Sequence, residues 1–208
     1  MALLLYLTRN LITSKKDPKL LPRPIELYNK NIIVFGLGGI GINICERLNS
    51  FGANIYGYTN DNLPLHSFIK KIFFDKSFYK DLSKMDIIIC AMPNTFRTKN
   101  FFNYKFFNKA KKGCFFINIS RGDLVNTDDL LTFVKNKTLS GVGLDVTSPE
   151  PLKANHKLRK FDNVIITPHI AGQSDGNRDR SYELLFENIK RYINKQKLLN
   201  IVSKEEEY

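Results

Sequence analysis

Ile32-Ile-Val-Phe-Gly-Leu-Gly-Gly-Ile-Gly41 is the stretch that decides the fold of this chain. It opens with a short apolar run of the kind found in buried strands, and glycines follow at Gly36, Gly38 and Gly41. At this spacing the first glycine permits a tight turn, the second lets the main chain approach a pyrophosphate, and the third lets a following helix pack on the strand. Amides at the start of that helix face the anion. The stretch therefore predicts a dinucleotide-binding turn between a strand and a helix.

Further apolar runs alternate with segments that fit helices. The runs are short and rich in β-branched or aromatic residues, as in strands covered on both faces, and they occupy 55–58, 87–89, 115–119, 142–146 and 164–166. Helices are expected at 39–51, near 77–83, at 101–110, at 127–136 after an Asn126 or Thr127 cap, and at 174–195. The alternation predicts an α/β fold with a doubly wound parallel sheet, that is, a Rossmann-type domain.

The ends of the chain are expected to add a helix on each side of this domain. Residues 1–24 fit an N-terminal helix over 1–14 and a proline-containing linker over 15–24. Residues 25–173 fit the dinucleotide-binding domain, and 174–208 a C-terminal helix and tail. The final helix places an apolar stripe on one side, expected to face the core: Tyr182, Leu185, Phe186, Ile189 and Ile193.

Composition narrows the class of protein. The chain has 208 residues, of which 43% are apolar, enough for an ordinary globular core. Its three cysteines are odd in number and lack metal-type spacing, which favours a reducing cytoplasmic setting and predicts no metal site. The apolar residues 2–7 are too few to span a bilayer, so no membrane partner is expected.

The net charge of +12 raises the question of a nucleic-acid partner. Lysine and arginine are scattered between different predicted elements instead of gathering on one of them. This distribution indicates a solvated basic surface and argues against nucleic-acid binding.

Three polar residues that follow later strands suit hydride-transfer chemistry on a keto acid. His169 can give a proton to the forming alkoxide, Glu150 can favour the imidazolium, and Arg121 can hold a carboxylate through two parallel hydrogen bonds. Taken alone, each residue is better explained without catalysis: His169 as an ordinary loop histidine, Glu150 as part of a Pro-Glu-Pro turn, and Arg121 as a surface ion-pair partner. Their joint position at strand ends, where open α/β sheets bind ligands, favours the catalytic interpretation.

The sequence resembles the D-isomer-specific 2-hydroxyacid dehydrogenases, in particular their nucleotide-binding domain. The resemblance rests on the glycine motif and on these segments: Ile117-Asn-Ile-Ser-Arg-Gly122, Gly143-Leu-Asp-Val146, Pro149-Glu-Pro-Leu152 and Asn163-Val-Ile-Ile-Thr-Pro-His-Ile-Ala-Gly172. It implies reduction of 2-keto acids such as glyoxylate or hydroxypyruvate to D-2-hydroxy acids, or the reverse, and assembly as a dimer.

The same resemblance implies roles for individual residues. Arg121 would hold the substrate carboxylate, Glu150 would tune the histidine, and His169 would be the general acid and base. Asp145 would hydrogen-bond the nicotinamide carboxamide. The other cofactor-binding positions would be Gly36, Gly38, Gly39, Ile40, Gly41, Thr59, Ile119, Ser120 and Gly172, with Pro93 and Thr98 in a loop near the adenine. Phe96 and Arg97 depart from the usual residues of that loop.

The choice between NAD and NADP stays open at this point. An acid is expected at the end of the second strand to hold the adenine ribose, but Thr59 stands there. Asp61 could replace the acid, which favours NAD. Lys70 and Lys71 could instead lie near a 2′-phosphate, which favours NADP.

A substrate-binding domain of about 100 residues, the size of one small domain, precedes the corresponding helix in the family and is not seen here. In the family it helps to orient substrate and exclude water. Three hypotheses follow: an oxidoreductase acting as a homodimer or with a partner supplying that domain, a non-catalytic NAD(H)-binding module, or a longer gene product in which Met1 is internal.

Overall fold

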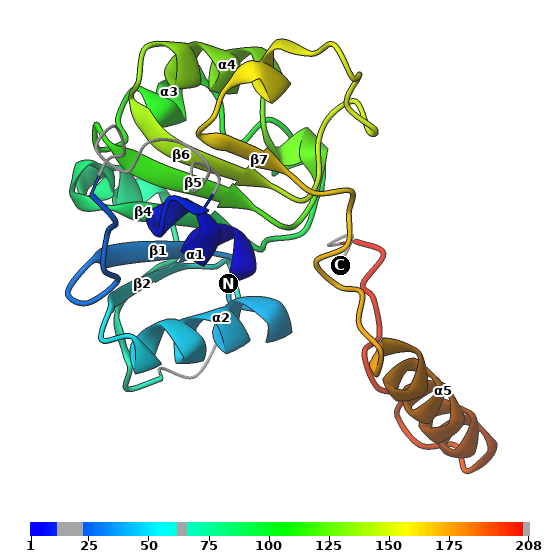
Figure 1. The fold of residues 1–208 in the computed structure, drawn as a ribbon. Helices are drawn as coiled ribbons and strands as arrows, with labels where there is room; N and C mark the ends of the chain where they lie inside the picture. Colours follow the sequence, from blue (N-terminus) through cyan, green and yellow to red (C-terminus); the bar gives the residue numbers. More distant parts are fainter. Residues whose placement is uncertain (12–22, 62–65, 206–208) are drawn as a thin grey trace. The chain divides into compact units, whose positions relative to one another are not determined.

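A computed structural model of the chain describes residues 1–11, 23–61 and 66–205 (Figure 1). The chain divides into two compact units, Met1–Pro168 and His169–Tyr208, and each is described by itself.

The first unit is built on a seven-stranded parallel sheet (Figure 1). Its strands are β1 (Asn31–Phe35), β2 (Asn54–Tyr58), β3 (Ile69–Phe73), β4 (Ile87–Cys90), β5 (Cys114–Asn118), β6 (Leu139–Leu144) and β7 (Val164–Ile166). Their order in the sheet is β3-β2-β1-β4-β5-β6-β7, so the direction of winding reverses between β1 and β4. The predicted doubly wound parallel sheet is confirmed, and its switch point lies beside the glycine turn that follows β1.

Strand β3 is the one that the sequence pattern did not predict. It reads Ile-Lys-Lys-Ile-Phe and forms one edge of the sheet, paired with β2 alone. Ile69 and Phe73 at its ends are buried, whereas Lys70 and Lys71 between them are exposed. An edge strand needs no continuous apolar run, and lysines are common on such edges.

Helices cover both faces of the sheet. The helices on each face pack against a separate cluster of buried hydrophobic side chains. Helices α1 (Ala2–Thr8) and α2 (Gly39–Ser50) lie on one face, and α3 (Tyr104–Phe107) and α4 (Thr127–Lys135) on the other (Figure 1). Short 3-10 turns complete the cover: η3 (Lys76–Lys80), η4 (Leu82–Lys84), η5 (Gly122–Leu124) and η6 (Lys157–Lys160). Among the described residues, no helix is long and apolar enough to cross a membrane.

Two predicted helices are shorter or tighter than expected. The helix expected at 101–110 is reduced to α3, because Phe102 pairs in a bridge with Val125 and its backbone bonds to Leu124 and Asn126. The segment near 77–83 forms the 3-10 turns η3 and η4. By contrast, Asn126 caps α4 as predicted, since its side chain accepts the Asp129 amide at 3.0 Å.

Helix α1 ends at Thr8, earlier than the helix that the sequence suggests over residues 1–14. Leu4 and Leu7 are buried against β5 and β6. The close approach uses glycine: a Cβ on Gly143 of β6 would lie 3.1 Å from the Leu3 Cβ. Residues 12–14 and most of the expected linker lie outside the described residues.

The second unit contains helix α5 (Asn177–Ile193), and here the expectation of a buried stripe is wrong. No residue of α5 is buried, and the five side chains of the predicted stripe are 46–71% exposed. The tail folds back on the helix, because Asn188 exchanges hydrogen bonds with the backbone of Leu199 at 2.8 and 3.2 Å. The period of the helix was predictable, but burial also requires a covering element.

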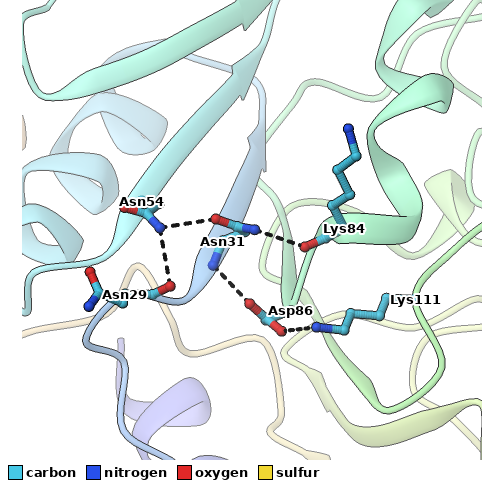
Figure 2. Close-up of polar contacts among 6 residues, drawn as sticks. All are labelled: Asn29, Asn31, Asn54, Lys84, Asp86 and Lys111. Atoms are coloured by element: carbon cyan, nitrogen blue, oxygen red, sulfur yellow. Dashed lines mark hydrogen bonds and ion pairs between the residues drawn. The ribbon is translucent and has the colours of Figure 1, made fainter.

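Polar side chains fasten the amino ends of the central strands, as Figure 2 shows. Asp86 accepts the Asn31 amide at 2.9 Å and pairs with the Lys111 ammonium at 2.6 Å. The Asn31 side chain donates to the Lys84 carbonyl, and the Asn54 side chain donates to Asn31 Oδ1, both at 3.1 Å. This network ties β1 to β2 and β4 at the end of the sheet opposite the glycine turn.

Candidate active site

The turn after β1 requires glycine at its first position. Gly36 has a φ of +91°, and a Cβ there would lie 2.5 Å from the Cα of Met92. Its amide donates to the Tyr58 carbonyl at 2.8 Å. The turn is thus pressed between the carboxyl ends of β2 and β4.

The other glycines of the motif differ in their surroundings: Gly41 is tightly packed, whereas Gly38 and Gly39 are open to solvent. A Cβ on Gly41 would lie 1.8 Å from the Gly36 carbonyl oxygen, so α2 can pack on the turn only with glycine there. Gly38 and Gly39 are exposed, and a Cβ on either would meet no heavy atom within 4 Å. Ile40 beside them is 64% exposed. Backbone open to solvent at the N-terminus of a 12-residue helix is the environment that a pyrophosphate needs.

The loop after β4 is held by hydroxyl groups. The Thr98 hydroxyl donates to the Pro93 carbonyl and accepts the Thr95 amide, both at 2.8 Å. The Ser120 hydroxyl donates to the Met92 carbonyl. Thr98 and Ser120 therefore shape this loop, and Thr95 is a member of the loop that sequence reasoning did not single out.

Asn118, at the end of β5, is a residue that sequence reasoning missed. It is fully buried; its side-chain oxygen accepts the Ser120 amide at 3.0 Å and its side-chain nitrogen donates to the Arg121 carbonyl at 2.9 Å. The Ile119 amide donates to the Cys90 carbonyl at 3.2 Å. Asn118 thus folds the loop that presents Ile119, Ser120 and Arg121. Its signal in the sequence is a polar residue ending an apolar run.

The loop carrying Arg121 touches the loop that leads to Glu150. A Cβ on Gly122 would lie 2.0 Å from the Thr147 carbonyl oxygen, so the two main chains are in direct contact. The Ser148 hydroxyl also donates to Asp123 at 2.5 Å. Arg121 and Glu150 are both exposed, and the Arg121 guanidinium donates to the Ser120 carbonyl at 2.7 Å.

Asp145 follows β6 and is only 2% exposed. Its amide donates to the Asn118 carbonyl at 2.9 Å, and its carboxylate accepts the Thr167 hydroxyl at 2.5 Å. The Thr167 amide in turn donates to the Leu144 carbonyl at 2.9 Å. The ends of β5, β6 and β7 are therefore joined through polar contacts.

His169 is the first residue of the second unit. It has a φ of +55°, and its carbonyl accepts the Gln173 side chain at 3.4 Å. Gly172 in the same segment is exposed. Arg121 and Glu150 belong to the first unit, so the convergence of His169 with them stays a prediction.

Thr59 directly follows β2 and is 4% exposed. Its amide donates to the Phe73 carbonyl at 3.1 Å, and its hydroxyl accepts the Asp61 amide at 3.1 Å. The threonine side chain thus organises a turn that leads to Asp61.

The cysteines offer no reactive thiol. Cys45, Cys90 and Cys114 are free and buried, and burial raises the pKa of each thiol to about 12. Within the described ranges, His, Cys, Asp and Glu side chains form no group of three or more that could hold a metal ion.

Comparison with known proteins identifies the family. The model for the D-isomer specific 2-hydroxyacid dehydrogenase, NAD binding domain, matches residues 1–171. A glyoxylate reductase of Thermofilum pendens is 34% identical over an alignment of 199 positions, which covers 90% of this chain and 58% of the relative. A human glyoxylate reductase/hydroxypyruvate reductase is 36% identical over 156 residues, or 74% of this chain and 47% of the relative.

A solved structure shows the same fold. The D-isomer specific 2-hydroxyacid dehydrogenase from Xanthobacter autotrophicus, in complex with NADPH and MES, aligns with a TM-score of 0.89 at 23% identity. The alignment covers 100% of this chain and 86% of that chain. The chain spans about half the length of the curated relatives it matches. The chain belongs to the D-isomer-specific 2-hydroxyacid dehydrogenase family and contains its NAD-binding domain.

Proposed function

We propose that the chain acts in an NAD(P)-dependent oxidoreductase that interconverts small 2-keto and 2-hydroxy acids of the glyoxylate or hydroxypyruvate type. The observation that carries this proposal is that the glycine turn and the loops of Arg121 and Glu150 all follow the carboxyl ends of strands in one parallel sheet. The open backbone of Gly38 and Gly39 lies beyond β1, and the joined loops of Arg121 and Glu150 lie beyond β5 and β6. The names of the relatives support the substrate class. A cytoplasmic setting, and a homodimer or a partner that completes the site, belong to the same proposal.

The residues around the glycine turn fit a dinucleotide. In the proposal the α2 amides after Gly38 hold the pyrophosphate, because no side chain obstructs them. The loop of Pro93 and Thr98 borders the adenine side, and Asp145 meets the carboxamide end. The remaining cofactor positions are Ile40, Thr59, Ile119, Ser120 and Gly172.

Bound nicotinamide would supply or accept the hydride. Arg121 would hold the substrate carboxylate, since a guanidinium matches that group through two parallel hydrogen bonds. His169 would give a proton to the substrate oxygen in reduction and remove it in oxidation. Glu150 would keep the imidazole protonated until the proton is needed, because a nearby carboxylate favours the charged form.

The test is oxidation of NADH or NADPH by the whole chain with glyoxylate or hydroxypyruvate. We expect His169→Ala to lower kcat/KM by about 100-fold or more with little change in cofactor affinity, because a general acid acts mainly in the transition state. His66→Ala, which alters a histidine stacked on Phe68 ahead of β3, is the matched control and should keep its turnover.

Unchanged turnover in His169→Ala would remove that residue from the mechanism. Cofactor binding by the chain without turnover on any 2-keto acid would instead favour the alternative of a non-catalytic NAD(H)-binding module.

A further inference from the structure

Two neighbouring residues could cap α4 on sequence grounds, and the structure gives them different roles. Asn126 is the cap, because its side chain accepts the Asp129 amide at 3.0 Å. Thr127 is the first residue of the helix, and its hydroxyl donates to the Ser148 carbonyl at 2.7 Å. The Thr127 hydroxyl therefore holds a loop that lies 21 residues further along the chain.

Asp123 holds the same serine from a second side. The Ser148 hydroxyl donates to the Asp123 carboxylate at 2.5 Å, and Asp123 belongs to the turn η5 that directly follows Arg121. The main chains of the two loops are also in contact, because a Cβ on Gly122 would lie 2.0 Å from the Thr147 carbonyl oxygen. The start of α4, the turn η5 and the loop after β6 are thus joined at one point.

Side-chain packing leaves a small void at this point. A pocket of about 10 Å³ is lined by Gly122, Thr127 and Ser148 together with apolar side chains such as Leu130 and Leu144. This volume is barely enough for one water molecule. Atoms that line a void lack packing partners on one side. The hydrogen bonds to Ser148 therefore supply a restraint that packing does not provide.

Glu150 lies on a short span whose two ends are anchored. Ser148 stands two residues before it, and Leu152 stands two residues after it. Leu152 is buried, and its carbonyl accepts the Arg159 guanidinium at 3.0 Å. Glu150 itself is exposed, so its place in the candidate site depends on these anchors more than on its own burial.

Given the proposed reduction of a 2-keto acid, on which this step rests, we infer that Thr127 and Asp123 are positioning residues of the reaction. By holding Ser148 from two sides, they keep the loops of Arg121 and Glu150 in one arrangement. A misplacement of about 1 Å can lower the rate of an enzyme about 100-fold. Loss of either contact should therefore lower turnover. It should not change cofactor affinity, because the glycine turn after β1 is not part of this contact.

The experiment measures NADH or NADPH oxidation by the whole chain with glyoxylate, using the cofactor that supports turnover, and the Kd of that cofactor. We expect Thr127→Val, which keeps the shape and removes the hydroxyl, to lower kcat/KM for glyoxylate about tenfold or more with the cofactor Kd unchanged. Thr127→Ser keeps a hydroxyl and should recover most of the loss. The matched control is Thr132→Val, because the Thr132 hydroxyl donates within α4, to the Asp128 carbonyl at 3.0 Å. This variant should keep full turnover.

A second pair of variants separates the charge of Asp123 from its hydrogen bond. Asp123→Asn removes the charge and keeps an oxygen that can accept the Ser148 hydroxyl, so it should turn over like the unchanged protein. Asp123→Ala removes both and should lower kcat/KM about tenfold or more. Because both residues act on one serine, Thr127→Val combined with Asp123→Ala should cost less than the product of the two single losses.

Four results would overturn the inference. They are an unchanged kcat/KM in Thr127→Val or in Asp123→Ala, equal losses in Thr127→Val and Thr127→Ser, single losses that multiply in the double variant, and a parallel loss of cofactor affinity. Absence of turnover in the unchanged protein would reject the proposed function itself, and the inference with it. A melting temperature well above that of the assay shows that each variant is folded.

Discussion

Substituting Gly41 by alanine tests how the glycine turn positions α2. The added Cβ would lie 1.8 Å from the Gly36 carbonyl oxygen, whereas ordinary van der Waals contact begins at 3.4 Å. Restoring ordinary contact would move the helix or the turn by the difference, 3.4 − 1.8 = 1.6 Å. The obstacle is backbone, so no side chain can rotate away to relieve it.

Two opposing contributions determine how the substitution changes the free energy of unfolding: overpacking against the turn and the higher helix propensity of alanine. Overpacking of this kind costs about 1–3 kcal/mol and sometimes more. Alanine gains up to about 1 kcal/mol over glycine in a helix. Because the overlap is large, we expect a net loss of about 2 kcal/mol in the free energy of unfolding. The displaced helix should also bind NADH more weakly.

Urea unfolding followed by circular dichroism measures the stability, with Gly39→Ala as the control. Gly39 is in the same helix, but a Cβ there meets no heavy atom within 4 Å. Its alanine variant should be as stable as the unchanged protein or slightly more so. Equal stability of Gly41→Ala and Gly39→Ala would refute the close packing of helix on turn.

Two further predictions concern parts of the molecule away from the glycine turn. Asp86→Ala should lower the free energy of unfolding by about 1–3 kcal/mol, because it removes the partner of the partly buried Asn31 amide. Urea unfolding measures this loss, and unchanged stability would contradict the role of the network. NADH affinity should not change, because the network lies at the amino ends of the strands, opposite the glycine turn. The three cysteines should resist a thiol reagent at neutral pH in the folded protein, because burial raises the pKa of each to about 12. All three should react after denaturation, and rapid labelling of the native protein would show that a thiol is accessible.

The sequence predicted best the strands whose residues are buried on both faces of the sheet. Apart from Asn31 and Asn118 at their ends, strands β1, β4 and β5 are apolar because both faces are covered, so their runs were recognisable. Strand β3 was missed because its two central lysines face solvent at the edge of the sheet. The α5 stripe had the right period, yet its burial was wrongly predicted, because periodicity says nothing about which element covers the helix.

The candidate site was predictable to a similar degree. Gly36 and Gly41 were recognised from spacing, and the structure adds the contacts with Met92 and with the Gly36 carbonyl. Asn118 was missed because a buried asparagine that bonds its own loop has no spacing rule. The sequence could not show what Thr59 does at the end of β2. Its hydroxyl accepts the Asp61 amide in a local turn, and no sequence pattern announces that hydrogen bond.

The central claim is that the open backbone at Gly38 receives the pyrophosphate of a nicotinamide dinucleotide. Its most direct measurement is a fluorescence titration of the chain and its Gly38→Val variant with NADH. A Cβ at Gly38 meets no protein atom within 4 Å, so the variant should fold normally. We expect saturable binding by the unchanged protein and a large loss of affinity in the folded variant. Equal affinity in both, or no binding by the unchanged protein, would contradict the account.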